Sequence, residues 1–397
     1  METKDKIYGT IFGQAIGDAL GLGTEFMSKT EVREKYPDGL KEYSQIIRDY
    51  HRAKFQPSSW SDDTDMMLCI ANAIIEDKGI NLHTIARNFK QWVYAPETRG
   101  VGQTTLKVLS IAEYVEKPHQ VAELIWRMTR TKNAANGSVM RTAIIGLKKE
   151  NVAQTAEDVC KLTHFDPRCV GSCVIVSEII NHLIWHDEQL SYSQIITIAN
   201  KYDKSIAEYI DKAYYNGIES LELDEPSSIG YTLKALGSAL WCLFHANDFE
   251  EGLLRVVNEG GDADTNAAVA CAMLGAKFGY TSIPQKYTDG LTRKSDLMRI
   301  TNYLMQIDIL EHRRGVVGQG AREHRPAQRV AQMEVVAPPH DGGEHLLEGG
   351  IGRGRPRQAD ARAHELAHQV GVGVVLVLEV LVEAALGHAG GGDDAVD

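Results

Sequence analysis

Two short acidic turns, each directly ahead of an apolar helical segment, carry the side chains best suited to chemistry. The first reads WSDDTD over residues 60–65 and precedes the apolar run MMLCIANAII. Helix N-capping and the helix dipole account for one or two of its acids. Three carboxylates within four positions repel one another unless a positive charge lies among them. Ligands that are all oxygen atoms suit Mg²⁺ or Mn²⁺ rather than zinc.

The second acidic turn reads GGDADT over residues 260–265 and opens a segment rich in alanine. Its two glycines allow a tight turn that directs Asp262, Asp264 and Thr265 toward one point. A D-x-D spacing alone is common. Two such turns, each opening a helix, favour a metal site, because both could meet over one pair of ions.

The opening segment YGTIFGQAIGDALGLGTEF, residues 8–26, is expected to form a helix that packs closely against another. Glycine in a helix costs roughly 0.5–1 kcal/mol relative to alanine, so glycines in register require a packing reason. Four of them share one helical stripe: Gly9, Gly13, Gly17 and Gly21. Asp18 and Glu25 follow near the C-terminal end, where carboxylates oppose the helix dipole. A bound cation would remove that conflict; solvation or pairing with Arg or Lys is the alternative.

Two weaker signals lie between the acidic turns. A glycine-flanked turn, NGSVMR over residues 136–141, could expose backbone N–H groups to an anion such as a phosphate. His164, in LTHFDP, is either an ordinary loop histidine or part of a cleft. Neither signal is specific on its own.

The elements that must position these residues are helices. Apolar residues recur at spacings of three and four in Thr64–Asp77, Leu82–Tyr94, Thr104–Val115, Val121–Arg130, Val170–His186, Ser191–Lys201, Lys204–Asn216, Gly230–Phe244, Phe249–Glu259 and Asn266–Phe278. The connections carry Pro, Gly, Asn and Asp, and alternating strand-like stretches are scarce. We therefore predict an all-α fold with one domain over residues 1–310.

The chain changes character beyond that domain. Residues 313–397 contain no Lys, Ser, Thr, Asn, Cys, Phe, Tyr or Trp, and aromatic residues supply much of a core's buried area. We expect residues 311–397, rich in Gly, Arg, His and Val, to be a poorly ordered tail or non-native read-through. An HExxH match at His364, Glu365 and His368 would suit zinc on a helix. Val374 stands where a third ligand should follow, which favours a chance match.

Composition narrows the function classes. The formal net charge is −12, which disfavours broad attraction to nucleic acid. Six cysteines without a CxxC pair indicate reduced thiols rather than a disulfide framework. The N-terminus lacks the apolar run of a signal peptide, and no window reaches ~18 uninterrupted apolar residues. We expect a cytoplasmic protein without a membrane span.

Taken in order, these motifs resemble the ADP-ribosylglycohydrolase family, whose members include dinitrogenase-reductase-activating enzymes and the J1 crystallins. The matching segments are GxxxGxAxGDALGxxxE at 9–25, SDDTDM at 61–66, NGSVMR at 136–141, TH at 163–164 and GGDADTNAA at 260–268. The resemblance spans residues 6–305 and implies a multi-helix orthogonal bundle around a central cleft with a dinuclear metal site. The implied reaction is hydrolysis of the bond between ADP-ribose and a modified target.

The resemblance also implies roles for individual residues. Two Mg²⁺ ions, with Mn²⁺ as a substitute, would be held by Ser61, Asp62, Asp63, Asp262, Asp264 and Thr265. Glu25 would lie beside the metals and assist them or the attacking water, and Asp63 is the second catalytic candidate. The substrate would contact Gly100, Gly102, Gly137, Ser138 and His164, with Gly137 and Ser138 at the diphosphate.

Two departures from the family pattern bear on these roles. Ser61 replaces the usual threonine of the first turn and keeps the hydroxyl. Some arginine-type hydrolases carry an acid just before the glycine that matches Gly102, where this chain has Gly100 and Val101. Proton transfer would then fall to Asp63, Glu25 or a metal-bound hydroxide, and the linked target residue stays open.

Two alternatives use the same cleft differently. One is an immunity protein that neutralises an ADP-ribosyltransferase toxin, either by hydrolysis or by occluding the toxin's active site. The other is a non-catalytic relative that only binds ADP-ribose. Retention of every acidic position of the motifs favours the enzyme over the binder.

Overall fold

The structure, a computed structural model, describes residues 2–129 and 134–307. Within them it contains fifteen α-helices and no strand, which confirms the all-α prediction. The HExxH motif at 364–368 lies outside the described residues. The α-helices are α1 (Thr3–Gly21), α2 (Lys29–Lys35), α3 (Asp62–Asp77), α4 (Leu82–Val93), α5 (Gln103–Ser110), α6 (Pro118–Met128), α7 (Val152–Cys160), α8 (Pro167–Trp185), α9 (Tyr192–Ala199), α10 (Lys204–Tyr215), α11 (Thr232–His245), α12 (Phe249–Val257), α13 (Ala263–Phe278), α14 (Gln285–Gly290) and α15 (Lys294–Met305).

Short 3-10 helices lie in the connections: η1 (Tyr43–Gln45), η2 (Arg52–Lys54), η3 (Ala112–Tyr114), η4 (Val139–Arg141), η5 (Ala143–Leu147), η6 (Ile218–Leu221), η7 (Pro226–Ser228) and η8 (Tyr280–Ser282). Among the described residues, periodicity located ten of the fifteen α-helices, and the glycine pattern of residues 8–26 predicted α1. The sequence analysis did not predict α2, α7, α14 or α15. Two of these have only seven and six residues, too few for a helical period to stand out.

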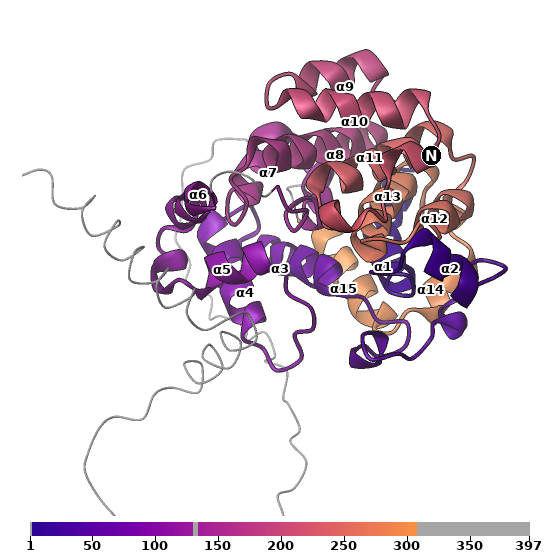
Figure 1. The fold of residues 1–397 in the computed structure, drawn as a ribbon. Helices are drawn as coiled ribbons and strands as arrows, with labels where there is room; N and C mark the ends of the chain where they lie inside the picture. Colours follow the sequence, from indigo (N-terminus) through magenta and orange to yellow (C-terminus); the bar gives the residue numbers. More distant parts are fainter. Residues whose placement is uncertain (1, 130–133, 308–397) are drawn as a thin grey trace, which may run out of the picture.

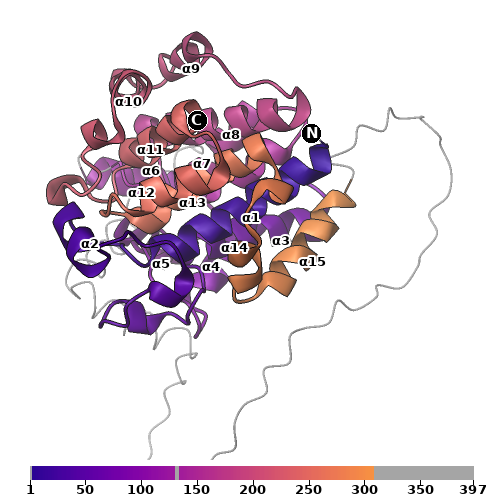
Figure 2. The same ribbon diagram turned by 90° about the vertical axis from the view of Figure 1, so that its right-hand side faces the viewer.

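The centre of the molecule is an antiparallel pair formed by α1 and α13, which lie side by side in Figures 1 and 2. The glycine stripe of α1 faces the small residues of α13. A Cβ atom added at Gly13 would lie 2.1 Å from the carbonyl oxygen of Cys271, and one at Gly17 would lie 2.2 Å from that of Ala267. The predicted packing reason for the stripe is therefore confirmed: the two backbones touch.

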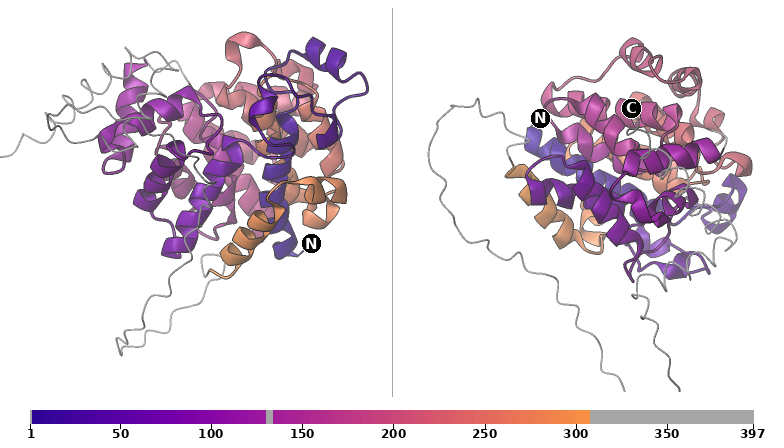
Figure 3. Two further views of the ribbon diagram at one scale, coloured as in Figure 1. Left: turned by 90° about the horizontal axis from the view of Figure 1, so that it is seen from below. Right: turned by 90° about the vertical axis from the view of Figure 1, so that its left-hand side faces the viewer.

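The remaining helices cover this pair. Helices α8, α11 and α12 pack against α13, and α3 and α15 pack against α1. Figure 3 shows α4–α6, in purple, at the end of the molecule opposite the indigo loop after α1. Helix α8 is long and apolar enough to span a membrane by length and composition alone, but 78% of that window is buried inside the fold. Burial of this kind is typical of a core helix.

The close contact predicts a large cost for one added methyl group. Gly13→Ala should lower the free energy of unfolding by about 1–3 kcal/mol or more, because helix backbone cannot give way as a side chain does. Gly79→Ala is the matched control, since its nearest neighbour would be 3.9 Å away. Urea unfolding of both variants measures the difference, and equal midpoints would contradict the packing role.

Candidate active site

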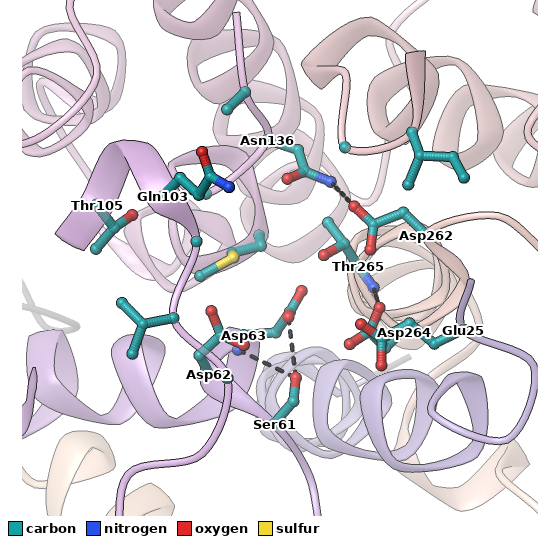
Figure 4. A pocket seen from close by; sticks show the side chains of 18 of the residues that line it. Glu25, Ser61, Asp62, Asp63, Gln103, Thr105, Asn136, Asp262, Asp264 and Thr265 are labelled. Atoms are coloured by element: carbon teal, nitrogen blue, oxygen red, sulfur yellow. Dashed lines mark hydrogen bonds between the residues drawn. The ribbon is translucent and has the colours of Figure 1, made fainter. Parts of the chain in front are cut away.

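One cleft of about 840 Å³ gathers nearly all residues singled out from the sequence. Its floor is built from the starts of α3 and α13 and from the loop after α1 (Figure 4). Every predicted site residue except Ser138 lines this cleft. A volume of this size suits a ligand larger than a single sugar.

Asp18 joins the first acidic turn to the central helix pair. Its carboxylate is fully buried and accepts hydrogen bonds from the backbone N–H of Ser61 (2.8 Å) and of Thr64 (3.0 Å), and from the Thr64 hydroxyl (2.7 Å). The acid near the end of α1 thus meets the positive end of α3, which resolves the dipole conflict seen in the sequence. Because its oxygens are already engaged, Asp18 positions the site.

The two acidic turns converge. A carboxylate oxygen from each of Asp18, Asp63 and Asp264 lies within 4.8 Å of the other two, and the same holds for Glu25, Asp262 and Asp264. Asp264 belongs to both groups and so lies between them. Acids from the start of α3 and the start of α13, far apart in the sequence, therefore lie close together, as the resemblance implied.

The electrostatics of this cluster call for a cation. Removal from water is the main cause that raises the pKa of Asp62, Asp63 and Asp264 well above the usual range, and repulsion between neighbouring carboxylates adds to it. The pKa values of Glu25 and Asp262 are raised for the same first reason. Among the described residues, Oδ1 of Asp63 is buried without a hydrogen-bond partner. An unpartnered oxygen within a cluster of buried carboxylates fits a hard divalent cation.

The remaining predicted ligands stand beside the carboxylates. The Ser61 hydroxyl donates to Oδ2 of Asp63 at 3.0 Å, and the backbone N–H of Thr265 donates to Oδ1 of Asp264 at 2.9 Å. Asp62 is partly exposed and faces the loop at Gly100, where an added Cβ would lie 3.1 Å from its Oδ1. Gly100 (φ +64°) therefore leaves room for this carboxylate. Gly102 lines the cleft beside it.

The third acid of the first turn faces away. Asp65 accepts hydrogen bonds from the indole N–H groups of Trp60 (2.8 Å) and Trp92 (3.4 Å) and lies 3.7 Å from Arg293. Through these contacts Asp65 ties the first turn of α3 to Trp92 and Arg293. Asp65 does not line the cleft. This difference between Asp65 and its neighbours makes it a matched control for the site.

The opposite wall is formed by residues 136–141 and His164. Gly137 lies against the imidazole, since a Cβ added there would be 3.0 Å from its Cε1. Burial and the nearby charge of Arg141 lower the pKa of His164 to about 3, so the ring is neutral. The ring contacts the Thr163 hydroxyl through Nδ1 at 2.7 Å, while Nε2 has no partner among the described residues.

Arg141 holds this wall together from within. Its buried guanidinium donates to the carbonyl oxygen of Gly137 (3.0 Å) and to the Thr163 hydroxyl (2.7 Å), and it lies 4.5 Å from the ring centroid of Phe89. Ser138, the next residue in the turn, is fully buried, and its side-chain hydroxyl has no partner within the described part of the chain. A diphosphate role for Ser138 stays a prediction.

Sequence reasoning assigned no role to several polar residues that line the cleft, among them Asn136 and His51. Asn136 donates from Nδ2 to Oδ2 of Asp262 at 2.7 Å and so fixes that carboxylate. Nε2 of His51 lies 2.6 Å from Oε2 of Glu25. Asn136 stood in a motif already noticed, but nothing in the sequence around His51 indicated its partner, which is 26 positions away.

A family model described as ADP-ribosylglycohydrolase matches residues 1–314, and the chain belongs to this family. A solved structure titled ADP-ribosylglycohydrolase-related protein complex superimposes with a TM-score of 0.59 at 22% identity, over 77% of this chain and 99% of the other. At that identity the likeness establishes the fold.

Two relatives carry more specific names. An ADP-ribosylarginine hydrolase (Tri1) of Serratia proteamaculans is 26% identical, over 77% of this chain and 80% of the relative. An ADP-ribosyl-[dinitrogen reductase] glycohydrolase of Rhodospirillum rubrum is 24% identical, over 73% and 91%. These names describe the relatives' activities.

The raised carboxyl pKa values predict how stability depends on pH and Mg²⁺. Burial raises the pKa of Asp18 from 3.8 to about 7, so this carboxyl holds its proton more tightly in the folded state. The folded protein therefore loses stability as the pH rises between these two values. The contribution of this cluster should therefore lower the melting temperature of the metal-free protein near pH ~8 relative to pH ~5. Mg²⁺ should raise the melting temperature more near pH ~8. Calorimetry checks this, and equal Mg²⁺ effects at both pH values would contradict it.

Proposed function

We propose that this protein is a Mg²⁺-dependent hydrolase that releases ADP-ribose from a modified protein. The observation that carries the proposal is the convergence of Asp63, Asp262 and Asp264 with Glu25 at one cleft. A family assignment alone would not separate an enzyme from a relative that only binds. Without a cation, the buried carboxylates lower the stability of the folded protein. A protein that only binds ADP-ribose has no need to keep them.

Two Mg²⁺ ions fit the oxygen-only set of Ser61, Asp62, Asp63, Asp262, Asp264 and Thr265. Bound there, they would polarise ribose hydroxyls and lower the pKa of water. The chain supplies the orientation: Asn136 fixes Asp262, and Asp18 fixes the start of α3. Ligand carboxylates held by such partners keep their direction when substrate enters.

Hydrolysis breaks the bond between the anomeric carbon and the target atom, gives a hydroxyl to the carbon, and returns a proton to the target. We assign the acceptance of the proton from water to Glu25 and Asp63, and the raised pKa that burial gives each carboxyl supports this assignment. Neutral His164 does not exchange protons near neutral pH. His164 lines the cleft beside Gly137, and its buried Nε2 has no hydrogen-bond partner among the described residues.

The target class follows from the relatives and is part of the proposal. A protein arginine modified with ADP-ribose is the substrate that the name of the Serratia relative suggests. Protection against an ADP-ribosylating toxin would use the same hydrolysis, so the enzyme assay comes first. Incubation with arginine-, serine- and nucleic-acid-linked ADP-ribose, with and without Mg²⁺, scored by free ADP-ribose, tests the function.

We expect release from the arginine-linked substrate with Mg²⁺ and loss of release in excess EDTA, because the carboxylates alone cannot orient the ribose hydroxyls. Restoring Mg²⁺ or Mn²⁺ after chelation should restore the rate. Full release in EDTA would sink the metal-dependent mechanism. No release from any substrate would refute the hydrolase.

Within the site, Asp264→Asn should lower kcat by about 100-fold or more, because this carboxylate belongs to both acid groups. Asp65→Asn is the matched control from the same kind of turn. It should keep kcat within a few-fold while lowering stability slightly, since its partners are Trp60, Trp92 and Arg293. Similar losses in both variants would show that the effect is structural.

A further inference from the structure

Phe26 combines exposure with backbone strain at the mouth of the cleft. The residue follows Glu25, lines the cleft, and is 57% exposed. Its φ is +60°, a left-handed conformation that is unfavourable for a bulky side chain. Because the residue is largely exposed, hydrophobic burial does not explain why a phenylalanine occupies this position.

Its surroundings hold the strained backbone in place. The N–H of Phe26 donates to the carbonyl oxygen of Gly261 (2.6 Å), and buried Arg52 donates to the carbonyl oxygen of Glu25 (2.6 Å). The ring lies against His51, at 5.2 Å between ring centroids, and the same imidazole contacts Glu25. The ring of Phe55 also contacts His51, with 5.8 Å between the ring centroids.

This aromatic wall of Phe26, His51 and Phe55 adjoins the carboxylates. Glu25 belongs to the acid group with Asp262 and Asp264, whereas Gln103 and Thr105 lie across the cleft from them (Figure 4). Given the proposed function, the anomeric carbon reacts beside the carboxylates, and the ADP portion extends toward Gly137 and His164. The aromatic wall then faces the group that leaves.

The chemistry of this wall suits a planar cation. Aromatic faces attract guanidinium groups, which also stack on them. The negative potential of the acidic cluster beside the wall also attracts a cation. The ammonium of Lys54 lies over Tyr50, 4.7 Å from its ring centroid, so this cation already has an aromatic partner.

We propose that Phe26 determines specificity by supporting the guanidinium of an ADP-ribosylated arginine against its exposed ring. The proposal rests on the proposed function for the orientation of the substrate. Phe26 does not move protons; it holds the target side of the scissile bond. Removal of the ring should therefore weaken binding of the modified arginine and leave the ADP-ribose portion unaffected.

The test uses Phe26→Gly and Phe26→Tyr. Glycine removes the ring and accepts the positive φ, so thermal unfolding should show a fold at least as stable as the parent. Tyrosine keeps the ring. Each is placed in the Asp264→Asn background, in which turnover is slow, and calorimetry measures affinity for an arginine-linked ADP-ribosyl peptide, its serine-linked counterpart and free ADP-ribose.

We expect Phe26→Gly to weaken arginine-linked peptide binding about tenfold, with free ADP-ribose and the serine-linked peptide changed less than about twofold. Phe26→Tyr should match the parent. Equal arginine-peptide affinities, or an equal loss for free ADP-ribose or for the serine-linked peptide, overturn the proposal. Turnover by the wild-type chain is read separately: its absence removes the hydrolase, while the affinities still decide the role of Phe26.

Discussion

The site depends on direct contact between the backbones of α1 and α13. With glycine at the contact positions of α1, the two helices approach closely enough to bring the end of one beside the beginning of the other. Glu25 leaves the first helix where Asp262 and Asp264 enter the second. Helices separated by ordinary side chains would lie 8–10 Å apart or so, and these acids would be spread further. Close packing of the two backbones offsets the conformational cost of helical glycine, and the same contact positions the site.

The same contact concentrates negative charge inside the protein. Carboxylates taken from water are unfavourable unless each has a donor or a cation. The chain supplies donors for Asp18 and Asp262 through Ser61, Thr64 and Asn136. It leaves an oxygen of Asp63 without a partner among the described residues. Stability is sacrificed at the positions where a ligand would restore it, which is common at functional sites.

The two walls of the cleft are built by different means. Residues 136–141 and His164 are fixed by buried Arg141, whose donors reach both segments. The wall around Phe26 and His51 consists instead of ring contacts among exposed Phe26, half-buried His51 and buried Phe55. Under the proposed function, the wall held by Arg141 would contact the ADP-ribose portion, and the wall at the mouth would contact the modified target.

The sequence by itself determined the helical class, most long helices, the glycine stripe and the two acidic turns, because these depend on local periodicity and on residue type. It also placed Asp262, Asp264 and Asp63 in one site through family motifs. The resemblance left Asp65 out of the ligand set, and only the tertiary structure shows the reason: Asp65 accepts hydrogen bonds from Trp60 and Trp92. The partnership of His51 with Glu25 and the strained exposure of Phe26 likewise required the fold. Local sequence encodes what a segment forms, whereas the direction of a side chain depends on neighbours that are distant along the chain.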